Sequence, residues 1–386
     1  MTSRGAPARP EGSAPDVLVV GGGLIGLASA WRLAAGGASV VTVDPTPGGG
    51  ASWAAAGMLA PVTEVHPGEE RLLRFNLVAA ASYPDFVAEL EDETGADVGY
   101  RRCGTLLVAR DSDDNAALED VFRYQMELGL EVERLTGRDC RKHEPALSPR
   151  TRGGILVPGD HQVDNRALVR ALLTACERRG VRFERRRVEA IEVERDRVAR
   201  IWLEGGGVSA ARHVVLAAGA RSGSIDGLAA AGLPTVRPVK GQLIHLRGPA
   251  PLVTSNVRGI DAYLVGRADG RVVLGATVEE QGFDLRITAG AVHELLRAAY
   301  ELVPGITELE VVETTAGARP CTPDNAPLLG RTAVEGLVVA TGHFRNGVLL
   351  TPVSARAVAE LILENRVDEA VEPFAPTRFA GEGVVR

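Results

Sequence analysis

The stretch Asp16–Asp44, DVLVVGGGLIGLASAWRLAAGGASVVTVD, decides the fold, because it reads as strand, tight turn, helix and strand. Val17–Val20 is a short apolar run rich in β-branched residues, as expected of a parallel strand buried on both faces. Gly21, Gly23 and Gly26 then form G-x-G-x-x-G where a helix should open. The first glycine permits the tight turn, the second a close approach of the backbone to a pyrophosphate, and the third close helix–strand packing.

The second half of this stretch supports the same interpretation. The helix has an apolar face, ends at Gly36-Gly37, and is followed by a second strand at Val40–Val43. Asp44 stands at the end of that strand, where an acid can accept hydrogen bonds from the ribose hydroxyls of an adenosine. Phosphates would lie at the helix N-terminus, against backbone N–H groups that lack intrahelical partners. The sequence therefore predicts dinucleotide binding, and the acid disfavours the 2′-phosphate of NADP.

Composition and charge are typical of a globular enzyme. The 386 residues predict two or three domains, and 45% hydrophobic with 24% charged residues is sufficient for a large core. The net charge of −7 disfavours a nucleic-acid partner, and the arginines between Arg182 and Arg187 are best explained as the solvated face of a strand. Four cysteines and seven histidines show no metal-ligand spacing, so we expect no metal site.

The two termini and the apolar runs bear on where the protein works. Residues 1–15 are rich in Gly, Pro, Ala and Ser and lack the apolar core of a secretory signal, so we expect a disordered tail. The longest apolar run, Val17–Trp31, is too short to span a bilayer and is broken by glycines. These features and the cysteine pattern predict a cytoplasmic protein without stable membrane insertion.

Further apolar strands at 213–218 and 337–340 return the chain to the nucleotide-binding sheet. Amphipathic helices are predicted at 69–94, 114–128, 166–178 and 290–302, and a long helix from 342 to 365. We therefore expect an α/β fold in which a Rossmann-type doubly wound domain is interleaved with a mixed-sheet domain. The expected boundaries are 16–70, 151–235 and 315–366 for the first domain, 71–150 and 236–314 for the second, and 367–386 for a C-terminal tail.

Small residues dominate the stretch 48–61, GGGASWAAAGMLAP. Such a segment can lie flat on a large planar group, such as a cofactor ring. It can equally form a small-residue helix that packs on the sheet, and the composition alone does not choose between the two.

Five further segments follow the glycine motif in a fixed order and carry a resemblance. They are ASWAAAGMLAP (51–61), VVLAAGARS (214–222), PVKGQLIHL (238–246), GARPCTPDNAPLLG (317–330) and GHFRNGVLLTP (342–352). Together they resemble the flavin-dependent amine oxidases of the D-amino-acid oxidase and sarcosine oxidase group, and within it the glycine oxidases of thiamine biosynthesis. The resemblance runs from Asp16 to Asn365. It implies that the dinucleotide is FAD, bound in extended form with its isoalloxazine at the domain interface.

The resemblance implies a set of cofactor-binding positions. The ADP half would be held by Gly21, Gly23, Gly26 and Asp44, the pyrophosphate and ring by Ser52, Ala55, Gly57, Met58 and Leu59, the adenine by Val188, and the phosphates by Ala218 and Gly219. The pyrimidine side would be lined by His343, Phe344, Arg345, Asn346, Gly347, Val348 and Leu349. Backbone N–H groups there would stabilise negative charge near flavin N1. The alternative for this last segment is an ordinary strand–loop–helix closure.

Three substrate-binding residues are also implied. Arg319 matches an arginine that clamps the substrate carboxylate, which suits the planar guanidinium fork. Tyr263 matches a tyrosine whose hydroxyl binds the same carboxylate, and Arg345 would be a second positive contact. From the residues alone, a core-facing tyrosine and surface salt bridges for the arginines are equally good explanations.

The implied reaction is the oxidation of glycine, sarcosine and small D-amino acids. A hydride would pass from Cα to the flavin, water would hydrolyse the imine to a 2-oxo acid and ammonia, and oxygen would be reduced to peroxide. No protein residue beyond the flavin would be catalytic. The alternatives are a D-amino-acid dehydrogenase that reduces a quinone, and a flavoprotein that only binds FAD. The resemblance also implies a homo-oligomer, a tetramer in many members, and a functional link to the thiazole synthase.

Two local features refine these expectations. Gly317 stands where some sarcosine oxidases attach the flavin through a cysteine, and Cys321 lies elsewhere, so we expect non-covalent FAD. Val278 stands where glycine oxidases carry a methionine near the substrate. We therefore expect a slightly roomier pocket that admits D-alanine or D-proline beside glycine.

Overall fold

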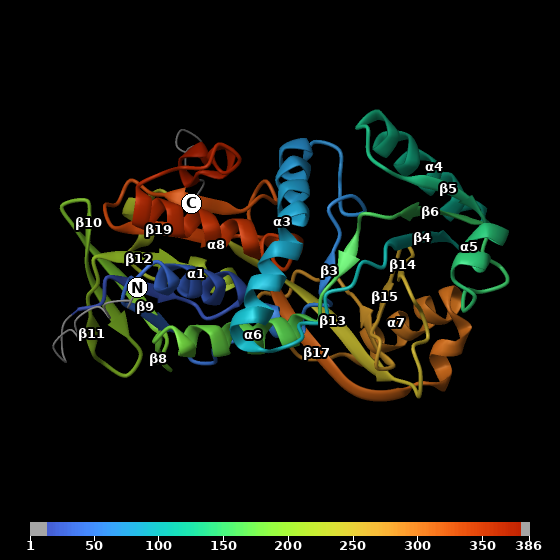
Figure 1. Ribbon diagram of the computed structural model, residues 1–386, viewed down its shortest axis with the longest axis horizontal. Coiled ribbons are helices and arrows are strands. Elements are labelled where there is room, and N and C mark those ends of the chain that lie inside the picture. Colours follow the sequence, from blue (N-terminus) through green and yellow to red (C-terminus); the bar gives the residue numbers. More distant parts are fainter. Residues whose placement is uncertain (1–13, 380–386) are drawn as a thin grey trace, which may run out of the picture.

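The computed structural model describes residues 14–379, in which two large β-sheets lie side by side, each with its own helices (Figure 1). The tail expected at 1–15 therefore lies almost entirely outside the described residues, as does the end of the tail expected at 367–386. Residues 367–379 are described and contain two short turns, η6 Glu372–Phe374 and η7 Pro376–Phe379.

The first sheet contains the glycine motif. Its six strands are, in spatial order, β18 Leu328–Arg331, β19 Leu337–Thr341, β12 His213–Leu216, β1 Val17–Val20, β2 Val40–Val43 and β8 Arg182–Glu184. The strands from β19 to β8 are parallel, and β18 pairs antiparallel with β19 at the edge. Because β1 lies between β12 and β2, the turn at its carboxyl end opens at the middle of the sheet. Ligands bind in such a crevice in doubly wound sheets.

Both faces of this sheet are covered. On one face, α1 Leu24–Ala35 and α8 Thr351–Ala359 pack against the strands. Outside them, α6 Asn165–Arg178 packs on α1, and α3 Glu70–Thr94 packs on α6 and α8. The core between them includes Trp31, Tyr83 and Leu168, all less than 2% exposed. The other face packs on a small sheet of β11 Val208–Ser209, β10 Arg197–Leu203 and β9 Val188–Glu194 and on η2 Leu228–Ala231. Strands buried on both faces explain the continuous apolar runs in the sequence.

The second sheet is mixed and has eight strands. In order they are β17 Glu310–Cys321, β13 Arg237–Arg247, β16 Arg271–Gly275, β15 Tyr263–Gly266, β14 Asn256–Arg258, β4 Thr105–Ala109, β6 Gly153–Val157 and β5 Glu133–Thr136. Only β14 and β4 pair in parallel among them. Its core also includes residues of α7 Ala289–Leu302, α5 Gly137–His143 and η3 Pro304–Glu308, while α4 Ser112–Glu127 packs at the β4–β6 end.

The long edge strand β17 joins the two sheets. Its C-terminal part contacts three short elements that belong to the first sheet's side: α2 Ala51–Ala54, η1 Gly219–Ser224 and η4 Phe344–Asn346. A second connection is the pair β3 Met58–Leu59 and β7 His161–Gln162. In the small-residue stretch, only Ala51–Ala54 form a helix, which packs on β17, and the chain continues to the short strand β3.

The structure confirms the predicted strand–turn–helix–strand at the N-terminus and the return strands β12 and β19, together with the α/β class. The edge strand β17 continues to Cys321, because it stays paired with β13 along its length. One expected element differs. The helix expected from residue 342 begins at Thr351 and ends in a π-helical turn, η5 Glu360–Glu364, because residues 342–350 form a loop over the first sheet.

The strand pairing bears on the expected domain boundaries. β6, expected in the first domain, pairs with β4 and β5 of the mixed sheet, and β17 beyond residue 315 pairs with β13. Helix α3, expected in the second domain, packs its Phe75 and Tyr83 in the core of the first sheet. We therefore propose that the mixed-sheet unit comprises about 97–160 and 237–321. Within residues 14–379, no helix is long and apolar enough to cross a bilayer.

Candidate functional site

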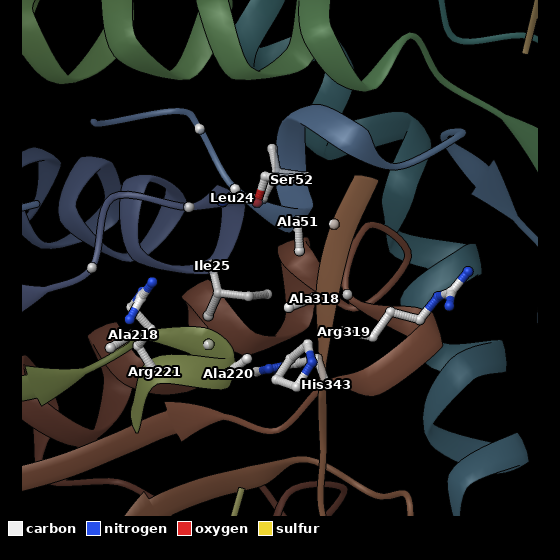
Figure 2. A pocket seen from close by; sticks show the side chains of 18 of the residues that line it. Leu24, Ile25, Ala51, Ser52, Ala218, Ala220, Arg221, Ala318, Arg319 and His343 are labelled. Carbon is white, nitrogen blue, oxygen red and sulfur yellow. Dashed lines mark hydrogen bonds between the residues drawn. The ribbon is translucent and has the colours of Figure 1, made fainter. Parts of the chain in front are cut away.

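A cavity of about 500 Å³ lies where the two sheets meet (Figure 2). Most of the expected site residues line it: Gly21, Gly23, Asp44, Ser52, Ala55, Gly57, Met58, Val188, Ala218, Gly219, Tyr263, Arg319, His343, Phe344, Arg345, Gly347 and Val348. Four expected residues do not line it: Gly26, Leu59, Asn346 and Leu349. Figure 2 shows Arg221 and Arg319 toward opposite sides of the view, with Ile25 and His343 between them.

The glycine turn is shaped by close packing at one end of this cavity. Gly21 has φ +105°, and a Cβ there would overlap the carbonyl group of Ala217 on the neighbouring strand. A Cβ at Gly26 would overlap the carbonyl oxygen of Gly21, so this glycine holds helix α1 against the turn without touching the cavity. The turn therefore brings bare backbone and the N-terminus of α1 to the cavity wall, which is an arrangement that suits a pyrophosphate.

Asp44 is oriented by two backbone hydrogen bonds. Its Oδ2 accepts from the N–H of Gly22 at 2.8 Å, and its Oδ1 accepts from the N–H of Thr46 at 2.7 Å. Ser52 braces the other side of the turn, since its Oγ accepts from the N–H of Leu24 at 3.0 Å. These bonds hold the carboxylate of Asp44 beside the start of α1, where adenosine hydroxyls could donate to its remaining lone pairs.

The small-residue stretch lies against the cavity because a buried arginine and a helix hold it from behind. Arg267 is 4% exposed, and its Nη2 donates to the carbonyl oxygen of Ala56 at 2.6 Å. Asn165, at the start of α6, donates through Nδ2 to the carbonyl oxygen of Ser52 at 2.8 Å. Gly57 has φ +80°, and a Cβ there would overlap the carbonyl oxygen of Val163. These contacts fix the chain from Ala54 to Met58 along one wall of the cavity.

The opposite wall is the loop after β19. His343 is 3% exposed, its Nε2 lies 2.8 Å from Oγ of Ser354, and burial lowers the pKa of its imidazole to about 3. The imidazole is therefore neutral at physiological pH. Gly347 and Val348 line the cavity through the same loop, whereas Asn346 and Leu349 point into the core and are 4% and 1% exposed.

Arg319 and Tyr263 lie together at the other end of the cavity. Arg319 donates through Nη1 to the carbonyl oxygen of Thr277 at 3.1 Å and to that of Lys240 at 3.4 Å. It forms no ion pair with any carboxylate in residues 14–379. Burial raises the pKa of the Tyr263 phenol, and the charge of Arg319 lowers it in part, so the hydroxyl stays protonated at neutral pH. The pair offers a free cation and a hydroxyl donor.

Arg345 is placed differently from the expectation. Its Nε lies 3.1 Å from Oε2 of Glu64, and its Nη2 contacts the carboxylate of Glu69. Glu64 also pairs with Arg258. Burial alone would raise the pKa of Glu64, but the charges of Arg258 and Arg345 outweigh it and hold that pKa below its usual range. Arg345 lines the cavity, but its charge is already neutralised.

The expectation about Val278 is wrong. Its side chain is 74% exposed and is not part of the cavity wall. The neighbouring Thr277 faces inward, where its Oγ1 accepts from the N–H of Gln242 at 2.9 Å. Because side chains alternate along extended chain, Val278 points outward. The cavity wall beside Tyr263 is formed instead by Leu243 and Met58, which pack in one cluster with its ring.

Several residues at or behind the cavity wall were not found from the sequence. Gly241 leaves room for the guanidinium of Arg319, and Gly275 leaves room for the ring of Tyr263, since a Cβ at either position would overlap those side chains. Arg221, two residues after Gly219, and Phe283, in a loop of the second sheet, also line the cavity, and the sequence analysis gave neither of them a role. Glycines in strand interiors are the one signal that could have pointed to the first two.

The residues at hand fit FAD. The glycine turn offers backbone N–H groups for a pyrophosphate, and Asp44 offers a carboxylate for ribose hydroxyls. The segment from Ala54 to Met58, which is mostly small residues, leaves space for a planar ring. A Cβ at Gly317 would meet that of Ala54 at 2.9 Å, and the thiol of Cys321 is fully buried, 3.4 Å from the carbonyl oxygen of Thr322. No thiol in the described chain therefore lies at the position expected for a covalent flavin link.

Comparison with known proteins agrees with this fit. The glycine oxidase of Geobacillus kaustophilus is 34% identical over 371 residues, which cover 95% of this chain and 98% of that protein. Its crystal structure matches with a TM-score of 0.88, over 95% of this chain and 99% of that one. The bifunctional protein ThiO/ThiG of Trichormus variabilis is 32% identical over 379 residues, 94% of this chain but 55% of that protein. The chain thus spans about half the length of that relative.

A family match completes the comparison. The FAD dependent oxidoreductase family, DAO, matches residues 16–361, which span the glycine turn, both sheets and every wall of the cavity. Because this match covers most of the chain and full-length relatives exceed 30% identity, this chain belongs to the FAD dependent oxidoreductase (DAO) family, and its cofactor is FAD.

Proposed function

We propose that the protein is an FAD-dependent glycine oxidase that also accepts sarcosine and the smallest D-amino acids. The observation that carries the proposal is the pairing of Arg319 with Tyr263 at the end of the cavity remote from the glycine turn. Arg319 is the cation there that no carboxylate of residues 14–379 neutralises, whereas Arg345 is held by Glu64 and Glu69. The similarity to glycine oxidases supports the same substrate class.

The proposed role of Arg319 is to bind the substrate carboxylate through two parallel N–H···O bonds. The hydroxyl of Tyr263 donates to the same carboxylate. With the carboxylate fixed, the substrate Cα has few orientations, and holding a reactant in its reactive geometry lowers the barrier substantially. FAD, when bound, supplies the hydride acceptor. The chain itself needs no strong acid or base, and the neutral His343 agrees with this.

The walls near Tyr263 favour small substrates. Leu243 and Met58 pack with the tyrosine ring and make this part of the wall apolar. A methyl group on the nitrogen or on the D face of Cα fits this description better than a long side chain. With Val278 outside the wall, we propose glycine and sarcosine as the preferred substrates, ahead of D-alanine and D-proline.

The proposal extends to the biological setting. A relative in which the matched region is joined to ThiG suggests that the imine of glycine supplies a thiazole synthase, which would be a functional partner. We also propose that the protein is cytoplasmic, as its cysteine pattern predicts, and that it forms a homo-oligomer, as the resemblance implies.

Oxygen consumption and peroxide release by the purified holoprotein test the proposal. We expect turnover with glycine and sarcosine, weaker turnover with D-alanine and D-proline, and none with L-alanine, whose side chain would take the place of the transferred hydrogen. A bulky D-amino acid preferred tenfold or more over glycine, about 1.4 kcal/mol in transition-state binding, would contradict the proposal. Turnover with a quinone analogue but not with oxygen would identify a dehydrogenase instead.

A further inference from the structure

Two arginines that line the cavity have no ion-pair partner within residues 14–379. Arg187 directly precedes β9, and Arg221 lies in η1 beside Ala218 (Figure 2). Within residues 14–379, neither guanidinium forms an ion pair or a hydrogen bond. Burial lowers the pKa of Arg221, and the charge of Arg187 lowers it further, so the two positive charges repel one another. An uncompensated pair of like charges at a cavity wall is unfavourable unless an anion joins it.

Acidic residues at this end are already engaged elsewhere. Both oxygens of Asp44 accept backbone hydrogen bonds, from Gly22 and Thr46. Glu184, three residues before Arg187, lies 3.8 Å from the guanidinium of Arg186. The first turn of α1 carries no acidic side chain. The nucleotide end of the cavity is therefore positive on two sides, from the helix N-terminus and from the arginine pair.

Phe283 holds Arg221 from the second sheet's side. Its ring centroid lies 4.5 Å from Cζ of Arg221, within the range of a cation–π contact, and the ring itself lines the cavity. Phe283 belongs to the segment 276–288, which connects β16 to α7. The ring is 40% exposed, so its contact with Arg221 is made at the edge of the cavity and not within a core.

Two buried side chains of β13 anchor this segment. Lys240 is 2% exposed, and its Nζ donates to the carbonyl oxygen of Arg286 at 2.6 Å. Gln242 is 1% exposed, and its Oε1 accepts from the N–H of Thr288 at 2.9 Å. The loop that carries Phe283 is thus tied to the rigid sheet at two points, and it reaches across to η1.

We propose that Arg187 and Arg221 bind the pyrophosphate of FAD together with the N-terminus of α1, and that Phe283 keeps Arg221 in position for this contact. Guanidinium groups suit phosphate oxygens because they can donate two parallel hydrogen bonds. The ring of Phe283, which comes from the second sheet, would then help the first sheet to retain FAD. This assignment goes beyond the proposed reaction, because it concerns how tightly FAD is held and not which amine is oxidised.

FAD release from the holoprotein tests the arginines. Diluting the holoprotein and measuring the fluorescence of free flavin gives the dissociation constant, without any assay of turnover. We expect Arg221→Ala and Arg187→Ala each to raise that constant about tenfold, and the difference from the unsubstituted protein to shrink as salt is added. The matched control is Arg185→Ala, an exposed neighbour outside the cavity wall, which should change the dissociation constant less than about twofold. A dissociation constant in Arg221→Ala equal to that of the control would overturn the proposal.

Competition identifies the group that the arginines contact. ADP and adenosine are used separately to displace FAD from the holoprotein. We expect Arg221→Ala to weaken the binding of ADP about as much as it weakens the binding of FAD. The affinity for adenosine should be unchanged. If ADP and adenosine lost affinity equally, the guanidinium would contact the base or the sugar, and this result would also overturn the proposal.

A double-mutant cycle tests the role of Phe283. Phe283→Ala should raise the FAD dissociation constant in the presence of Arg221 and have little further effect in Arg221→Ala, because the ring acts through that side chain. Additive effects would show that Phe283 acts independently of Arg221. Glycine oxidation at saturating FAD reports on the proposed reaction separately, so a failure of either proposal is distinguishable from a failure of the other.

Discussion

Arg319 and Arg345 line the same cavity, but their partners give them different roles. Arg345 pairs with Glu64 and Glu69, whereas Arg319 donates to the carbonyl oxygens of Lys240 and Thr277 and pairs with no carboxylate in residues 14–379. Carbonyl oxygens orient a guanidinium without neutralising it, so its charge remains available to a ligand. We therefore propose Arg319, with Tyr263, as the carboxylate site and regard Arg345 as part of the wall.

The first prediction concerns Arg319. Arg319→Ala should retain FAD and lose about 2–5 kcal/mol of transition-state binding in kcat/KM for glycine, because the substrate carboxylate would be left without its partner. Arg319→Lys should recover little, since an ammonium cannot replace the planar fork. Steady-state kinetics measure the change in kcat/KM, and the flavin absorption spectrum checks that FAD is retained. The control is Arg297→Ala on the exposed side of α7, and kinetics for Arg319→Ala matching that control would remove Arg319 from the site.

The second prediction concerns Gly241. A Cβ at this position would lie 2.6 Å from Cζ of Arg319, at the flexible end of that side chain. Gly241→Ala should therefore fold normally but displace the guanidinium, so that KM for glycine rises while the absorbance spectrum of bound FAD is unchanged. Gly290→Ala is the matched control, because a Cβ there meets nothing within 4 Å. Equal KM values for the two variants would show that Arg319 needs no such space.

At the scale of the elements, β13 and β17 connect the end of the cavity that contains Arg319 and Tyr263 to helix α6. His245 on β13 lies with its Nε2 3.0 Å from Oγ1 of Thr315 on β17 and 3.2 Å from Nη2 of Arg166 on α6. Arg166 in turn pairs with Glu313 at 2.7 Å. Burial, with a smaller contribution from the charge of Arg166, lowers the pKa of His245 to about 4. The contact between the sheet and the helix thus depends on a neutral imidazole.

The third prediction follows from this contact. Between pH 6.5 and about 4 the unfolded chain binds a proton at His245 that the folded chain does not, so the free energy of unfolding falls as the pH is lowered through this range. Between pH 7 and 5 the loss from this residue should be on the order of 1–2 kcal/mol. Urea unfolding of His245→Gln should show a correspondingly weaker pH dependence, whereas the exposed His293→Gln should retain that of the unsubstituted protein. Identical pH profiles for both variants would contradict the assignment.

At the scale of the whole molecule, the site exists only because the sheets meet. The glycine turn and Asp44 come from the first sheet, while Tyr263 and Arg319 come from the second. The segment 276–288 reaches back from the second sheet to η1. Anything that separates the sheets should therefore disturb cofactor and substrate binding together.

The fourth prediction concerns the cofactor as a whole. The purified protein should be yellow, and acid precipitation should release all of its FAD into the supernatant, because Gly317 offers no thiol and Cys321 is buried away from the cavity wall. The absorbance of supernatant and pellet after precipitation measures this. Flavin that stays with the precipitated protein would show a covalent link.

The sequence alone was sufficient for the elements whose signals are local. Gly21, Gly26 and Asp44 act within one strand–turn–helix–strand unit of about thirty residues, where spacing along the chain determines spacing in space. Continuous apolar strands likewise revealed β12 and β19, because strands buried on both faces need no polar alternation. The family resemblance, carried by motifs in order, then led to FAD and to Arg319.

Tertiary structure decided what depends on contacts between distant segments. Whether Arg345 is free or neutralised depends on Glu64 and Glu69, nearly three hundred residues earlier in the chain. Which way Val278 points depends on Thr277 bonding to β13, and how far β17 extends depends on its pairing with the same strand. The alignment of Arg221 with Phe283 has no sequence signal at all. Charge compensation and side-chain direction are set by neighbours in space, and a single sequence specifies these neighbours only once the chain is folded.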